Sequence, residues 1–102
     1  NGIISTKNNL VRCAMKENLL TIQRVFLIDW GSLNSIKNLI DKSNEPDAFE
    51  ILPAVAAPYF INNVKTNGII IAGGLITKSS EAEELFKKGV RAISTSEKSL
   101  WL

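Results

Sequence analysis

The sequence predicts an α/β protein in which parallel strands alternate with helices. Short apolar runs alternate with segments whose apolar residues recur at helical spacing, from one end of the 102-residue chain to the other. Five strand-then-helix units follow one another, and each helix carries the chain back across the sheet, so consecutive strands run parallel. The apolar run at residues 69–72 is continuous and β-branched, which is typical of a strand covered on both faces.

The first unit is predicted to be a strand at residues 2–6 and a helix at about residues 9–17. In that helix Leu10, Cys13 and Ala14 share one side. Cys13 is the only cysteine, so it cannot form an internal disulfide, and we expect a buried, inert thiol. A single thiol of this kind favours a reducing, cytoplasmic setting.

The second unit is predicted to be a strand at residues 20–26 and a helix at about residues 32–42. Ser32 can cap the free amides at the start of this helix. The apolar residues that recur in it at helical spacing are Leu33, Ile36, Leu39 and Ile40.

Two prolines frame the third unit. Its strand is predicted at residues 48–52 and ends at Pro53. Pro58 suits the first turn of the following helix, because the N–H that it lacks would have no helical partner there.

The fourth and fifth units complete the pattern. The strand at residues 69–72 is followed by Ser80-x-x-Glu83, a capping-box sequence, and Gly89 suits the left-handed end of the resulting helix. The fifth strand is predicted at residues 90–94, with a last helical turn from residue 96 onward.

Two architectures fit five parallel units. One is a (β/α) barrel of the TIM type, of which these would be five of eight units, and the other is an open five-stranded doubly wound sheet. Five barrel strands alone would leave two unpaired edges, so the barrel requires further strands or a partner chain. Because the chain opens on Asn1-Gly2 and runs straight into a strand, we expect it to be a fragment of a longer protein.

Composition narrows the classes of function. Apolar residues make up 45% and charged residues 22%, as in folded globular domains. The absence of histidine excludes His-ligated zinc and histidine acid–base catalysis from this segment. No apolar run approaches the roughly 20 residues of a membrane-spanning helix, and no metal-ligand spacing is present, so we expect no membrane contact, metal or cofactor. The net charge of +2 is interspersed and does not by itself indicate a nucleic-acid surface.

Two neighbouring strand ends predict a phosphate site, since ligands of parallel α/β proteins bind beyond the carboxyl ends of the strands. Gly73 and Gly74 follow the fourth strand, and Ser94, Thr95 and Ser96 follow the fifth. Backbone amides at glycines can approach an oxyanion closely, and the hydroxyls add donors. The alternative is a tight turn with hydroxyls that only cap it.

Glu50 is a carboxylate inside the third strand, where a charge is seldom buried without a partner. Lys7 and Arg24, at neighbouring strand ends, can pair with it. Two interpretations stay open: a structural ion pair, or a site in which Lys7 or Arg24 faces a phosphate while Glu50 accepts hydrogen bonds from ligand hydroxyls. No nucleophile–base pair is recognisable, so no catalytic residue is predicted.

Five short motifs resemble, in order, those of one known family. They are GIISTK (2–7), TIQR (21–24), EILP (50–53), IAGGLI (71–76) and AISTS (92–96). Together they resemble the glycerol-3-phosphate-responsive antiterminators, the regulators of glycerol uptake operons, over essentially the whole chain.

The resemblance implies a phosphate-binding TIM barrel that senses rather than catalyses, with residues 1–102 as the carboxyl-terminal part of that single barrel domain, its strands four to eight. Glycerol 3-phosphate would bind at the barrel mouth, and the protein would then act on leader mRNA to prevent transcription termination ahead of glycerol-metabolism genes. The ligand-site residues carried over are Lys7, Arg24, Glu50, Gly73, Gly74, Ser94 and Thr95. The competing hypothesis is a phosphate-binding barrel enzyme that acts on a small phosphorylated substrate. A homo-oligomer is compatible with either.

Overall fold

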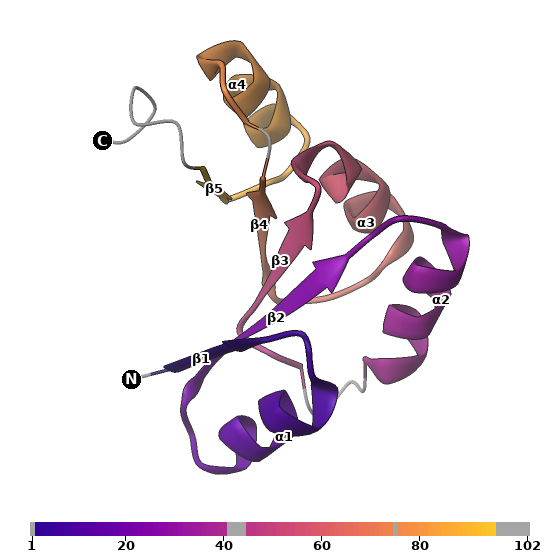
Figure 1. Ribbon diagram of the computed structural model, residues 1–102, viewed down its shortest axis with the longest axis vertical. Helices are drawn as coiled ribbons and strands as arrows, with labels where there is room; N and C mark the ends of the chain where they lie inside the picture. The colour runs from indigo at the N-terminus through magenta and orange to yellow at the C-terminus, as the bar shows by residue number, and fades with distance from the viewer. Residues whose placement is uncertain (1, 41–44, 75, 96–102) are drawn as a thin grey trace.

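The computed structural model describes residues 2–40, 45–74 and 76–95, and one parallel sheet runs through them (Figure 1). Its strands are β1 (Gly2–Ser5), β2 (Leu20–Phe26), β3 (Ala48–Leu52), β4 (Ile69–Gly73) and β5 (Ala92–Ser94). They pair in chain order, and all four pairings are parallel. The predicted α/β class with parallel strands is therefore confirmed.

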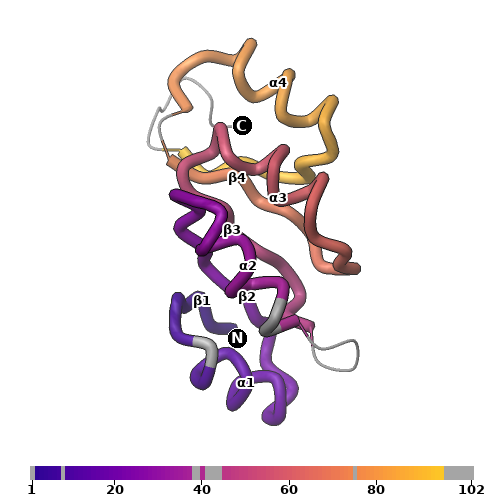
Figure 2. The backbone as a smooth tube through the Cα atoms, turned by 90° about the vertical axis from the view of Figure 1, so that its right-hand side faces the viewer, coloured from indigo at the N-terminus to yellow at the C-terminus, as the bar shows by residue number. Residues whose placement is uncertain are grey.

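The helices lie in an arc along one side of this sheet (Figure 1). They are α1 (Asn8–Lys16), α2 (Trp30–Leu39), α3 (Ala57–Asn63) and α4 (Ser79–Lys87), and a short 3-10 turn, η1 (Ala54–Ala56), precedes α3. Figure 2 looks at the molecule from that side and shows them following one another in chain order from α1 at the bottom to α4 at the top. The molecule thus has two layers, a sheet and one layer of helices.

The sheet is open, because among the described residues β1 and β5 each pair with one neighbour only. An open five-stranded sheet was the predicted alternative to a barrel, and the described strands form an open parallel sheet. A doubly wound sheet also reverses its strand order at a switch point. From β1 to β5 the order runs without a reversal.

The hydrophobic core lies between the sheet and the helices. It joins alternate strand residues to one face of each covering helix, and its members include Val25, Phe49, Ile51, Ile70, Ala72, Leu33, Phe60, Ala82 and Leu85. The rings of Phe49 and Phe60 meet with their centroids 5.2 Å apart, which fastens α3 to β3. Side chains alternate along a strand, so the residues between these core positions form a second face that the described helices do not cover.

That second face carries large apolar side chains in contact with solvent. Ile4 is 53% exposed, Phe26 55% and Ile69 49%, although each belongs to a strand. Isolated exposed apolar residues are common on protein surfaces, but these three recur on one face of one sheet. We call this surface the open face, and it also carries Arg24 and Glu50, which alternate with the core residues Val25 and Phe49.

Two helix starts differ from the prediction. α2 is capped by Asp29 rather than Ser32, since Asp29 Oδ1 accepts a hydrogen bond from the Ser32 amide at 2.7 Å. α4 begins at Ser79, and Glu81 rather than Glu83 supplies the capping carboxylate. Both segments offer several suitable caps in succession, and the choice is made by which oxygen reaches the free amides.

The predicted burial of Cys13 is wrong. Cys13 is exposed and Leu10 is 43% exposed, whereas Val11 and Ala14 are the buried residues of α1. α1 packs mainly against β1 and β2 at one end of the sheet, so its buried stripe is narrow and includes Val11 and Ala14 rather than Leu10 and Cys13. The last helical turn predicted from residue 96 lies outside the described residues.

At the end of α4, the predicted left-handed conformation of Gly89 is confirmed, but the predicted start of the fifth strand is not. Gly89 has a φ of +109°, as its left-handed position requires. Val90, which we assigned to the fifth strand, instead donates its N–H to the Leu85 carbonyl at 3.1 Å and is 2% exposed. It therefore closes the helix, and β5 begins two residues later, at Ala92.

Replacing Phe60 by alanine should lower the free energy of unfolding by about 3–5 kcal/mol, because a fully buried ring leaves a cavity against Phe49. Urea unfolding followed by circular dichroism measures this. Phe86→Ala is the matched control, since that ring is 45% exposed and its loss should cost about 1 kcal/mol or less. Equal losses for both variants would contradict the assigned core.

Candidate functional site

The predicted site residues lie at the carboxyl edge of the sheet, except that Arg24 and Glu50 lie within their strands, two residues before the ends of β2 and β3. In a parallel sheet these ends gather at one edge, which is where such proteins bind ligands. The residues are Lys7 after β1, Arg24 in β2, Glu50 in β3, Gly73 and Gly74 at the end of β4, and Ser94 and Thr95 at the end of β5.

Arg24 and Glu50 form an ion pair on the open face. They are register partners on β2 and β3, and the Arg24 Nε lies 2.6 Å from Glu50 Oε1. The side chain of Glu50 is 10% exposed and that of Arg24 is 41% exposed. The pairing predicted for Glu50 is thus present, with the buried carboxylate neutralised by a cation that still reaches solvent.

Gly73 leaves the space that the Glu50 carboxylate occupies. A Cβ built on Gly73 would lie 3.2 Å from Glu50 Oε2 and 3.4 Å from its Cγ. A glycine at the end of an apolar strand often marks such a close approach. Contacts therefore link Arg24, Glu50 and Gly73 across β2, β3 and β4, although the register partner of Glu50 on β4 is Ile71.

The backbone amide of Gly74 does not lie free for an oxyanion, although the sequence predicted that it would. Its φ is +80°, a conformation that favours glycine, and its amide donates to the Ser94 carbonyl at 3.2 Å. That amide joins β4 to β5, so in this conformation it is engaged within the chain rather than directed at a ligand.

The amides of Thr77 and Lys78, just before α4, are also engaged. Glu81 Oε1 accepts hydrogen bonds from the Thr77 amide at 3.2 Å, the Thr77 hydroxyl at 3.3 Å and the Lys78 amide at 3.1 Å. A helix start is a ready site for an anion, and here the anion is a carboxylate of the protein itself. At this edge the Gly74, Thr77 and Lys78 amides are therefore already bound within the chain.

Thr95 ties the end of β5 to the loop between β4 and α4. Its hydroxyl donates to the Ile76 carbonyl at 2.6 Å. Ser94 is exposed beside it, at the end of the strand. Ser96, the third hydroxyl of the predicted motif, lies outside the described residues.

Lys7 stands apart from the ion pair. It is exposed at the amino-terminal flank of α1, and none of the hydrogen bonds or ion pairs of the described residues joins its side chain to Arg24 or Glu50. The loop that carries it is held by Gln23, whose buried side-chain amide donates to the carbonyls of Ser5 at 3.3 Å and Thr6 at 3.2 Å. Gln23 is thus a positioning residue that its polarity in a core position could have revealed.

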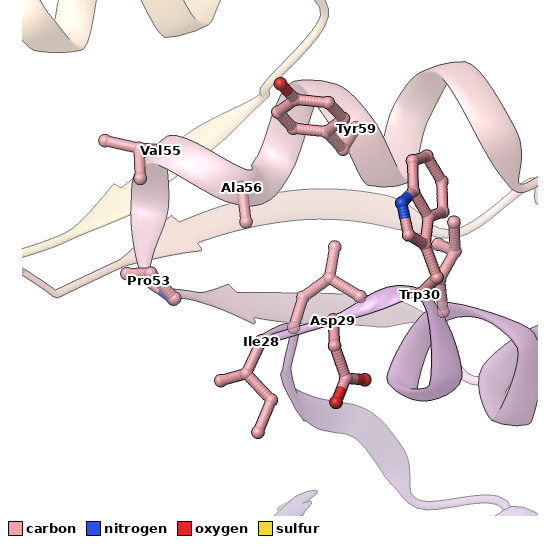
Figure 3. Close-up of a pocket in the computed structure, with 9 residues that line it drawn as sticks. Ile28, Asp29, Trp30, Pro53, Val55, Ala56 and Tyr59 are labelled. Carbon is pink, nitrogen blue, oxygen red and sulfur yellow. The ribbon is translucent and has the colours of Figure 1, made fainter.

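An apolar groove lies at the same edge, between the loops that follow β2 and β3 (Figure 3). Its volume is about 520 Å³, and Figure 3 shows Ile28, Asp29 and Trp30 on one wall and Pro53, Val55, Ala56 and Tyr59 on the other. The rings of Trp30 and Tyr59 meet edge to face, with centroids 6.5 Å apart. The sequence did not predict this groove, because it is built from apolar residues that sequence patterns assign to a core.

Two broader features of the described residues complete the chemistry. They include no group of three or more Cys, Asp or Glu side chains that could hold a metal ion. None of their helices has the length and apolar character needed to span a bilayer.

These features define a parallel α/β protein whose strand ends present a guanidinium–carboxylate pair. The family model described as "Glycerol-3-phosphate responsive antiterminator" matches residues 1–101. The chain therefore belongs to the glycerol-3-phosphate responsive antiterminator family, and the resemblance drawn from its five motifs is confirmed.

Similar proteins agree with this assignment. The glycerol uptake operon antiterminator regulatory protein of Listeria monocytogenes is 36% identical, and its crystal structure matches with a TM-score of 0.85 over 98% of this chain and 54% of that one. A glycerol uptake operon antiterminator-related protein of Thermotoga maritima is 32% identical, with a TM-score of 0.87 over 98% and 56%. The uncharacterized protein YgcP of Escherichia coli K12 is 36% identical over 98% of this chain. The chain spans about half of the length of each, 52% in the case of YgcP.

Replacing Asp29 by alanine should lower the melting temperature at neutral pH, because α2 loses its cap at the groove. The Ser32 amide, followed by the Ser32 hydroxyl, holds the pKa of Asp29 below its usual 3.8. A depressed folded-state pKa means that the stabilisation is fully present above pH 3.8 and is lost as the pH falls through the folded-state pKa.

Thermal unfolding of both proteins between neutral pH and pH 2 would measure this difference. Asp29→Asn is the control, since its amide oxygen can still cap the helix, and it should recover much of the stability at neutral pH. A gap between wild type and Asp29→Ala that stayed constant throughout the acid range would contradict the assigned cap.

Proposed function

We propose that this chain is the carboxyl-terminal part of a (β/α)-barrel regulator that binds glycerol 3-phosphate and leader mRNA and prevents transcription termination ahead of glycerol-metabolism genes. The family match over residues 1–101 is the observation that carries the proposal. Transcription takes place in the bacterial cytoplasm, so the proposal includes a cytoplasmic location and a regulatory rather than a catalytic role.

The strand order supports the barrel. Barrel strands pair in chain order with the helices outside, and this sheet has the same order with its helices along one side (Figure 1). The apolar residues of the open face, such as Ile4, Phe26 and Ile69, would then point into the barrel interior, which barrels fill with side chains. Relatives about twice as long have room for three further strands.

The position of the candidate residues supports the proposed ligand. At the carboxyl edge, where barrels bind their ligands, lie Lys7, Gly73, Gly74, Ser94 and Thr95. Arg24 and Glu50 lie two residues before the ends of β2 and β3. Arg24 is a cation whose side chain is 41% exposed, and a guanidinium suits the geometry of a phosphate. These residues form the proposed site for glycerol 3-phosphate.

Glycerol 3-phosphate should raise the melting temperature of the full-length protein, because a ligand that binds only the folded state stabilises it by mass action. At a hundred times its dissociation constant the gain is about 2.7 kcal/mol. Differential scanning fluorimetry with millimolar ligand measures the shift, and glycerol without phosphate is the control. An unchanged melting temperature would remove the ligand from the proposal.

Binding to leader RNA should weaken steeply as salt is raised, because cationic side chains release counterions from the phosphates that they contact. The logarithm of the affinity should fall linearly with that of the salt concentration, by about 0.7 for each phosphate contacted on a single strand. Filter binding between 50 and 300 mM salt measures the slope, with a shuffled RNA of equal length as control.

An affinity that did not respond to salt would count against direct RNA contact.

In a transcription assay on a leader with its terminator, readthrough should rise only when protein and glycerol 3-phosphate are both present. Readthrough that rose with the protein alone would separate antitermination from ligand sensing.

A further inference from the structure

We propose that Arg24 is the residue that holds the ligand phosphate, and that Glu50 and Gly73 are positioning residues that act through Arg24 without touching the ligand. The inference rests on the proposed function and deepens it, since it assigns separate roles to residues of one site. It replaces the expectation that Glu50 binds ligand hydroxyls.

The Arg24 guanidinium keeps most of its donors for a ligand. Arginine carries five N–H groups, and the one on Nε is directed at Glu50 Oε1, 2.6 Å away. This hydrogen bond anchors the inner side of the guanidinium, and among the described residues no hydrogen bond joins its two terminal nitrogens, with their four N–H groups, to Glu50. The side chain is 41% exposed, so this outer fork is the part that an anion can approach.

The side chain of Glu50 has little surface that a ligand could reach. Its side chain is 10% exposed, one oxygen is bound to Arg24, and the other lies 3.2 Å from where a Gly73 Cβ would stand. A carboxylate with so little exposed surface can orient its partner cation but offers little contact area to a ligand hydroxyl.

Gly73 fixes where the carboxylate can lie. A side chain there would meet Glu50 at a distance that forces the neighbour to move by a few tenths of an ångström. Because Glu50 holds Arg24 through one short bond, that movement would be passed on to the guanidinium. The three residues therefore form a chain of contacts from β4 to β2 with the anion-binding group at its end.

The contribution of the Arg24–Glu50 pair to folding stability does not by itself explain why it is present. A partly buried pair often contributes no more stability than apolar residues of similar volume, since both charges lose hydration. The open face around it is otherwise rich in apolar residues such as Phe26 and Ile69. A guanidinium that is held in one orientation, and so loses less freedom when it binds a phosphate, accounts for the pair at this position.

The test measures dissociation constants by calorimetry for the full-length protein with two phosphate monoesters. Glycerol 3-phosphate carries hydroxyls, whereas n-propyl phosphate carries none. Arg24→Lys, Glu50→Gln and Gly73→Ala should each weaken binding, and for any one variant the factor should be the same for both esters. We expect a factor of about ten for Arg24→Lys and for Glu50→Gln. Combined with Arg24→Lys, Glu50→Gln should add little, because it acts through the residue already changed.

Matched controls are available within the chain. Glu84→Gln changes a carboxylate that pairs with Lys88 at 3.6 Å on the surface of α4. Gly31→Ala places a Cβ 3.3 Å from the carboxylate oxygen of Asp29, a neighbour of the same kind as at Gly73 but remote from Arg24. Arg12→Lys changes an exposed arginine of α1. All three should bind both esters as the wild type does.

The outcomes separate this inference from the function on which it rests. If Glu50→Gln weakened glycerol 3-phosphate but not n-propyl phosphate, Glu50 would contact the hydroxyls and its positioning role would be overturned. If the three site variants bound both esters like the wild type, the role of Arg24 would fall while the proposed function stood.

If the wild type bound n-propyl phosphate through Arg24 but showed no preference for glycerol 3-phosphate, the proposed ligand would fall and the roles of Arg24, Glu50 and Gly73 would stand. Binding of neither ester would overturn both proposals. Circular dichroism of each variant checks folding, and if Glu50→Gln did not fold, Gly73→Ala and Arg24→Lys would carry the test.

Discussion

Burial of β3 on both of its faces is the constraint on which the rest of the structure depends. Phe49 and Ile51 are enclosed by the helices on one side, and Ala48 and Glu50 are enclosed by neighbouring strands on the other. The first pair anchors the core. The second places a carboxylate where it must be neutralised, so β2 has to present a cation in the same register, and Arg24 meets that requirement.

The hydrogen-bond donors near the strand ends divide between the backbone and a side chain. The Gly74 amide is bound to Ser94, and the Thr77 and Lys78 amides are bound to Glu81. These backbone donors stabilise the fold, whereas the guanidinium of Arg24 remains accessible. Recognition that relies on a side chain is more easily altered by substitution than recognition by amides, because amides are present whatever the residue.

The sequence predicted the order and type of the elements well, and β2 and β3 with their observed bounds. Those strands are apolar runs bounded by turns or proline, and their pattern admits one interpretation. It predicted caps and helix faces less well. Around Asp29 and Glu81 several residues can cap, and the buried side of α1 depends on how much of the sheet it covers, which no local pattern records.

The sequence predicted which residues are candidates for the site, but not which of them contact one another. The rule that ligands bind at strand ends found Arg24, Glu50 and Gly73, yet their contact depends on the register between three strands, which the sequence does not display. The groove between Trp30 and Tyr59 was missed for a related reason. It is formed by two loops brought together by the sheet, and its residues have the composition of a core.

Pairing in chain order has a consequence for how the molecule is made. Each strand is hydrogen-bonded to the strand one unit earlier in the sequence, so the contacts that define the sheet span one strand–helix unit and no more. Folding that relies on contacts of short sequence separation closes only short loops at each step. Synthesis on the ribosome delivers the units in the same order, so each new strand emerges beside a template that already exists. The growing edge of the sheet then advances with the growing chain.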